Sequence, residues 1–190
     1  MCQSFEELLV EQCAPALCGR KAANLFRVSG MEREEVIRAV GYWNEQLKAC
    51  SIAVRILKEC ACGRGFLICV YRTKWLAHVL RGTRTRAFLR AEGYRISDDT
   101  EEMLSQLSER LCVSGDFPHE IGVFLGYPLR DVIGFIENHG ENYTCVGYWK
   151  AYGNPDRARK IFDSYRRCTE QCMADFRRGV SVLQMAAAAL

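Results

Sequence analysis

The sequence predicts an α+β fold in which a small, mainly antiparallel sheet of about four strands is packed by about six helices. Several segments place apolar residues at helical spacing, others are short and β-prone, and the two kinds do not alternate strictly along the chain. The 190 residues are 49% hydrophobic and 26% charged, which is enough to bury a substantial core. No repeat, linker or low-complexity segment divides the chain, so we expect a single domain over residues 1–190.

The first three elements follow from capping and periodicity. Residues 5–17 predict a helix, because Ser4 and Glu7 have the spacing of a capping box. Residues 24–28 are short and β-like. Residues 31–50 predict an amphipathic helix with an acidic first turn, which the helix dipole favours.

A hairpin and a long helix are expected next. Residues 52–57 alternate in polarity and residues 66–71 form a continuous β-prone run, so both are predicted as strands. Residues 60–65 contain two glycines and predict the turn between them. Residues 75–91 predict one helix, with Gly93 as its C-terminal cap.

The second half of the chain contains more helix-breaking residues. After a helix at residues 101–111, Pro118 is expected at the first position of a short helix that Gly126 ends. Pro128 then opens a further helix, and residues 143–152 predict a strand.

The C-terminal part is simpler. Residues 156–178 predict a closing amphipathic helix, and the tail at residues 179–190 is expected to fray or to add one turn.

Composition restricts the classes of partner. The net charge of +3 gives no nucleic-acid signature, and no segment reaches the ~20 apolar residues of a membrane span. The densest basic run contains four arginines, which fit a solvated helix face or, alternatively, a phosphate-bearing partner. These are Arg81, Arg84, Arg86 and Arg90.

Eleven cysteines are many for this length. The basic flank and apolar run of a secretory signal do not precede them, so we expect the thiols to be reduced in a cytoplasm. Most of them are expected to be small buried side chains. Cys60 and Cys62 lie in the predicted turn, and Cys168 and Cys172 share one helix face. Four such thiolates would suit zinc or an iron–sulfur cluster if the two pairs met, and otherwise they are unrelated thiols. Cys145, on the predicted strand, fits a buried core position better than a nucleophile.

The pair His119-Glu120 is the main acid–base candidate. Just inside a helix start, the histidine would suit proton transfer or metal binding, while the simpler interpretation is a first-turn pair that serves the helix dipole. The spacing is not His-Glu-x-x-His. No phosphate loop is present in the sequence. Arg72 and Lys150 are candidates for contacting an anionic ligand, with ordinary surface charge as the alternative. Asn138, in an Asn-His-Gly turn, is a further candidate for ligand binding.

Several strings of residues resemble an uncharacterised bacterial family. The chain is similar to the domain-of-unknown-function family 3793, and the resemblance extends over residues 9–172. The resemblance implies a bacterial cytoplasmic protein and no established activity, cofactor or partner. Gln12 stands where that family usually has a histidine, so a role for that histidine is in doubt here. The strings are residues 13–17, 23–26, 117–128, 131–138 and 145–152.

Three hypotheses for function follow. The first is a non-enzymatic binding or regulatory domain that recognises a small ligand or a protein partner near residues 117–138. The second is an enzyme of unknown reaction, with His119 and Glu120 as acid–base groups and Arg72 or Lys150 holding an anionic substrate. The third is a metal-binding or redox protein that uses its thiolates.

Overall fold

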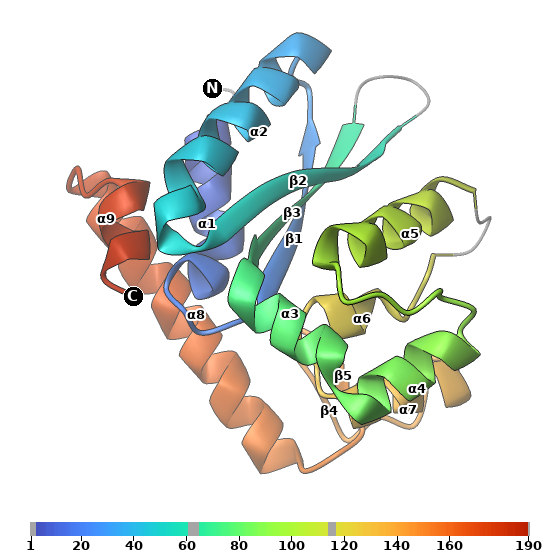
Figure 1. Cartoon of the computed structure of the whole chain (residues 1–190). Coiled ribbons are helices and arrows are strands. Elements are labelled where there is room, and N and C mark those ends of the chain that lie inside the picture. The colour runs from blue at the N-terminus through green and yellow to red at the C-terminus, as the bar shows by residue number, and fades with distance from the viewer. Residues whose placement is uncertain (1–2, 61–64, 114–116, 190) are drawn as a thin grey trace.

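A three-stranded antiparallel sheet forms the centre of the computed structural model, which describes residues 3–60, 65–113 and 117–189 (Figure 1). The strand order is β1-β3-β2, with the predicted hairpin as the β2–β3 pair. The turn predicted at residues 60–65, with Cys62, falls largely outside the described residues. The strands are β1 (Ala23–Ser29), β2 (Ile52–Glu59) and β3 (Gly65–Arg72).

Both faces of this sheet are buried. Alternate residues point to opposite sides of a strand, and here Val54 and Ile68 face one hydrophobic cluster while Leu57 and Tyr71 face another. The sheet is therefore the middle layer between two helical layers, which confirms the α+β prediction.

The first helical layer brings the two ends of the chain together. α8 packs along α1, and α9 lies beside α1 and α2 (Figure 1). A single-turn 3₁₀ helix at Lys48–Cys50 joins α2 to β2. The layer consists of α1 (Phe5–Leu17), α2 (Arg33–Leu47), α8 (Pro155–Arg177) and α9 (Val182–Ala187).

The second helical layer covers the opposite face of the sheet. Its core contains Leu76, Leu104, Phe124 and Val132, each from a different helix. The layer consists of α3 (Thr73–Arg81), α4 (Thr83–Ala91), α5 (Thr100–Val113), α6 (Ile121–Phe124) and α7 (Leu129–Glu137).

Side-chain caps define several helix starts. Ser4 accepts a hydrogen bond from the backbone N–H of Glu7 at 3.1 Å, as its position predicts. Asn154 caps α8 in the same way. The C-terminal tail forms a helix, α9, over residues 182–187. Ser181 and Gln184 form a complete capping box at its start, and its apolar side chains are buried against α1 and α2.

Two helix predictions were wrong. The helix expected at residues 75–91 is two helices, because Gly82 adopts an extended conformation with ψ 131° and separates α3 from α4. Pro118 is not the first residue of a helix. It begins a turn in which the Ile121 N–H donates to the Pro118 carbonyl, and α6 starts only at Ile121.

The strand expected at residues 143–152 is instead a tight hairpin of β4 (Cys145–Val146) and β5 (Lys150–Ala151). The chain reverses at Gly147, whose backbone lies so close to Phe162 that an added Cβ would be 2.3 Å from that ring. Cys145, expected at a buried core position, is only half-buried, because the turn interrupts the alternation of the predicted strand, whereas Trp149 after the turn is buried.

The basic run of α3 and α4 contacts acidic neighbours. Arg86 and Arg81 both form ion pairs with Asp98, which lies in the loop after α4. Among the described residues, no helix combines the length and the apolar character needed to cross a bilayer.

Candidate ligand-binding site

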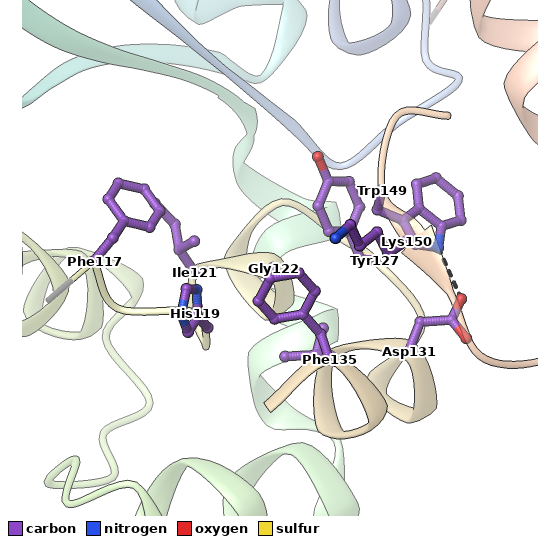
Figure 2. A pocket seen from close by; sticks show the side chains of 10 residues that line it. Phe117, His119, Ile121, Gly122, Tyr127, Asp131, Phe135, Trp149 and Lys150 are labelled. Atoms are coloured by element: carbon purple, nitrogen blue, oxygen red, sulfur yellow. Dashed lines mark hydrogen bonds between the residues drawn. The ribbon is translucent and has the colours of Figure 1, made fainter. Parts of the chain in front are cut away.

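A pocket of about 170 Å³ lies where α6, α7 and β5 meet (Figure 2). Its walls are mostly apolar and aromatic, with four ionisable side chains among them, one of which is a tyrosine. The lining residues are Phe117, His119, Ile121, Gly122, Tyr127, Asp131, Val132, Phe135, Trp149 and Lys150.

Stacked aromatic rings form one wall of the pocket. The Tyr127 and Trp149 rings stack at 4.9 Å between centroids, and the Trp149 ring meets Phe162 of α8 edge-on at 4.5 Å. Lys21 Nζ lies 4.8 Å from the centre of the Tyr127 ring. Burial raises the pKa of Tyr127 to about 12, so this ring is a neutral phenol at physiological pH.

Asp131 fixes the position of that wall. Its Oδ2 accepts a hydrogen bond from the Trp149 indole N–H at 2.8 Å, which Figure 2 shows as a dashed line. Its Oδ1 accepts from the backbone N–H of Tyr152 at 2.9 Å. Since the carboxylate is buried and accepts one bond on each oxygen, Asp131 ties α7 to the β4–β5 hairpin and sets the orientation of the indole.

Lys150 provides the cation of the pocket. Its Nζ donates to the Gly140 carbonyl at 2.7 Å and lies 5.8 Å and 5.0 Å from the ring centres of Phe135 and Tyr143. Within the described part of the chain, no carboxylate forms an ion pair with it. An ammonium group has three donors, so Lys150 retains donors for a ligand.

His119 and Glu120 are adjacent in sequence but have different environments. His119 is exposed at the rim of the pocket, with its ring 4.8 Å from that of Phe135. Glu120 is buried, where it accepts from the Tyr94 hydroxyl at 3.1 Å and pairs with Arg110 at 3.4 Å. His119 and Lys150 therefore line the same pocket, whereas Glu120 makes a separate contact in the core.

Arg72 and Asn138 lie outside this pocket. Arg72 donates to the carbonyls of Ala16 and Leu17 at the end of α1. Asn138 caps the end of α7, where its amide donates to the Gly134 carbonyl at 2.8 Å.

The cysteine candidates separate in a similar way. Cys60 ends the described part of the β2–β3 hairpin, and Cys62 lies outside the described residues. Cys168 and Cys172 instead meet Cys18, which follows α1, and the three sulfur atoms lie within 4.8 Å of one another.

These features define an α+β protein with a sheet buried between two helical layers and a small aromatic pocket beside it. The chain belongs to the DUF3793 family of proteins of unknown function, whose family model matches residues 9–186. The match therefore continues past residue 172, where the expected resemblance ended, and includes all but the last residue of α9. Comparison with curated proteins and with solved structures gives no significant match.

Sequence reasoning did not single out Tyr127, Asp131 and Trp149 as a group. Each belongs to one of the strings on which the resemblance rests, but their spacing gives no sign that the three side chains meet. The signal available was chemical: an aspartate on the inward face of an apolar helix needs a hydrogen-bond donor close by.

Proposed function

We propose that the protein binds a small organic molecule with a flat apolar body and a carboxylate group, in the pocket between α7 and β5. The main support for this proposal is that Lys150 lines a pocket with aromatic walls and has no carboxylate partner among the described residues. Pockets that combine an apolar lining with a few convergent polar groups are the usual sites of small ligands.

The size of the pocket restricts the ligand. Its volume of about 170 Å³ is close to the ~150 Å³ of an apolar cavity that accommodates benzene. The pocket therefore has the size of a single six-membered ring, and a carboxylate on that ring would bind Lys150. His119 lies at the exposed rim of the same pocket.

Benzoate is a suitable probe, and benzamide is its neutral counterpart of the same shape. A fragment of this size is expected to bind with a Kd on the order of 1 mM, which corresponds to about 4 kcal/mol. Isothermal titration calorimetry should show benzoate binding more tightly than benzamide, because only benzoate offers a charge to Lys150.

Two matched variants test the role of the cation. Lys150→Met keeps the length of the side chain and removes its charge, and should weaken benzoate binding about tenfold, the value of one hydrogen bond to a charged group. Lys160→Met, on the exposed side of α8, should leave binding unchanged. Equal binding of benzoate to both variants, or of benzoate and benzamide to the native protein, would contradict the proposal.

A second candidate function is an enzyme in which His119 transfers a proton to a substrate held by Lys150. It is favoured by the position of both side chains around one pocket. Glu120 has no part in it, because its carboxylate is held by Tyr94 and Arg110. If His119→Gln preserves ligand affinity and no turnover of a bound carboxylate is detected with the native protein, binding alone is the function.

A further inference from the structure

Three cysteine side chains converge where α1 ends against the middle of α8. Cys168 and Cys172 are four residues apart on one face of α8, and Cys18 follows the last residue of α1. The Cys18 and Cys172 sulfur atoms are 3.2 Å apart, and all three sulfurs lie within 4.8 Å of one another. In a tetrahedral zinc site with Zn–S bonds of about 2.3 Å, sulfur atoms are separated by about 3.8 Å, so small side-chain rotations suffice to accommodate an ion.

Two positive charges act on the cluster, because Arg72 and Arg20 both favour the thiolate of Cys18. Hydrogen bonds within the cluster and burial raise the pKa of Cys168 and Cys172, so a metal ion that binds here would displace their protons. Arg72 is held beside the cluster by its hydrogen bonds to the Ala16 and Leu17 carbonyls, which also offset the negative end of α1. A helix C-terminus would otherwise oppose a thiolate at this point.

The cluster borders a surface hollow of about 790 Å³. Cys172 is buried, while Cys18 and Cys168 are half-buried and face the hollow, so an ion has a path from solvent. Three described side chains supply sulfur, which leaves the fourth position of a tetrahedral ion open to water or to a small molecule in the hollow. Zinc sites with three protein ligands and an exchangeable fourth position are typically reactive, whereas those with four protein ligands are structural.

We infer that Cys18, Cys168 and Cys172 form a binding site for a soft metal ion such as Zn²⁺, with one exchangeable coordination position facing the hollow. The site is separate from the aromatic pocket and does not depend on the ligand proposed for it. It uses two of the four cysteines that the sequence suggested and replaces the pair in the β2–β3 hairpin with Cys18. Thiolate ligands are the set that soft ions prefer over magnesium or calcium.

The test uses the full-length protein, reduced with a phosphine and kept without air. Zn²⁺ is added, excess ion is removed, and native mass spectrometry counts the bound metal. Competition with a chromophoric chelator then gives the affinity. Co²⁺ in place of Zn²⁺ gives sulfur-to-metal charge-transfer absorption, which reports thiolate ligation directly.

The half-buried ligands provide the informative variants. Cys18→Ser and Cys168→Ser should each lower Zn²⁺ affinity at least about 100-fold. Loss of a residue that only hydrogen-bonds to a metal ligand already costs up to about 100-fold, and loss of a ligand itself should cost more. Cys112→Ser, at an exposed position on α5, and Cys60→Ser should keep one ion and the cobalt spectrum. Far-UV circular dichroism confirms that each variant is folded.

Two results would overturn the inference. One is equal Zn²⁺ affinity in the native protein, Cys18→Ser and Cys168→Ser, which would place the ion elsewhere. The other is a reduced native protein that holds no Zn²⁺ and forms a Cys18–Cys172 disulfide in air, which would make the cluster a thiol pair and not a metal site.

Discussion

Lys21 is a buried cation whose removal should make the protein more stable. It lies between α1 and β1, with 3% of its surface exposed. Its Nζ is 4.8 Å and 5.9 Å from the ring centres of Tyr127 and Tyr165, and in the described part of the chain no carboxylate pairs with it. Burial, which penalises the ammonium, lowers the pKa of Lys21 from 10.5 to about 8.

This lowered pKa gives the sign and the size of the effect. Between pH 8 and pH 10.5 the unfolded chain binds a proton that the folded chain has released, so the free energy of unfolding rises with pH in this window. At about 1.4 kcal/mol per pH unit, the charged Lys21 destabilises the folded state by about 3 kcal/mol at pH 7. Attraction to the two tyrosine rings offsets about 1 kcal/mol of this penalty.

Lys21→Met keeps an apolar side chain in the same space and removes the charge. We expect its free energy of unfolding at pH 7 to exceed that of the native protein by about 2 kcal/mol. Between pH 7 and pH 10 most of this difference should disappear, because native Lys21 loses its proton. Burial raises the pKa of the neighbouring Tyr127, Tyr165 and Cys69 to about 12, so these groups stay neutral over the range.

Urea unfolding under reducing conditions at pH 7, 8, 9 and 10 measures this difference. Lys160→Met, which removes an exposed lysine, controls for the general change in charge and should follow the native curve. A Lys21→Met protein that is less stable than the native protein at every pH, by a constant amount, would contradict a destabilising role for Lys21. It would show that the ammonium is stabilised by its aromatic neighbours more than burial destabilises it.

Two further predictions concern the hairpin and its attachment. Asp131→Ala leaves two buried donors without an acceptor and should lower the free energy of unfolding by about 3 to 5 kcal/mol, whereas Asp156→Ala, at an exposed site, should cost below about 1 kcal/mol. A loss below 1 kcal/mol for Asp131→Ala would mean that water replaces the carboxylate. Gly147→Ala should cost about 1 to 3 kcal/mol, because its new methyl group meets Phe162 at 2.3 Å. Gly41→Ala, inside α2 with open space around it, should instead stabilise the protein by about 0.5 to 1 kcal/mol. Urea unfolding measures both glycine variants, and a Gly147→Ala protein more stable than Gly41→Ala would show that the contact with Phe162 does not restrict Gly147.

The elements that could be predicted from the sequence are those with strong local signals. The helix from Phe5 to Leu17 has a side-chain cap at Ser4, and the β2–β3 hairpin has alternating strands. Gly82, which separates α3 from α4, is a local signal that the helix prediction did not use, whereas the β4–β5 hairpin depends on a tertiary contact. The turn at Gly147 follows from its contact with Phe162, a residue of another element, and no pattern within residues 143–152 indicates it.

The candidate sites were predicted only in part, because local patterns indicate individual residues and not the tertiary contacts between them. His119 and Lys150 stand out as ionisable residues in apolar segments, and both line the pocket. Cys18 could not be paired with Cys168 and Cys172 from sequence, because 154 positions separate it from Cys172 and only the packing of α1 on α8 brings them together.

The most direct test of the ligand-binding proposal is the indole N–H signal of Trp149 in a ¹⁵N-labelled sample titrated with benzoate. The chain has three tryptophans, and the Trp149 signal is assigned by its absence in Trp149→Phe, so the other two serve as internal references. Trp149 lines the pocket and its N–H is bound to Asp131, so a ring placed against the indole should shift this signal in a saturable manner. Benzoate should shift the Trp149 signal alone, with a weaker effect in Lys150→Met. A Trp149 signal that stays unchanged up to saturating benzoate, or that moves together with the other two, would contradict the ligand-binding proposal.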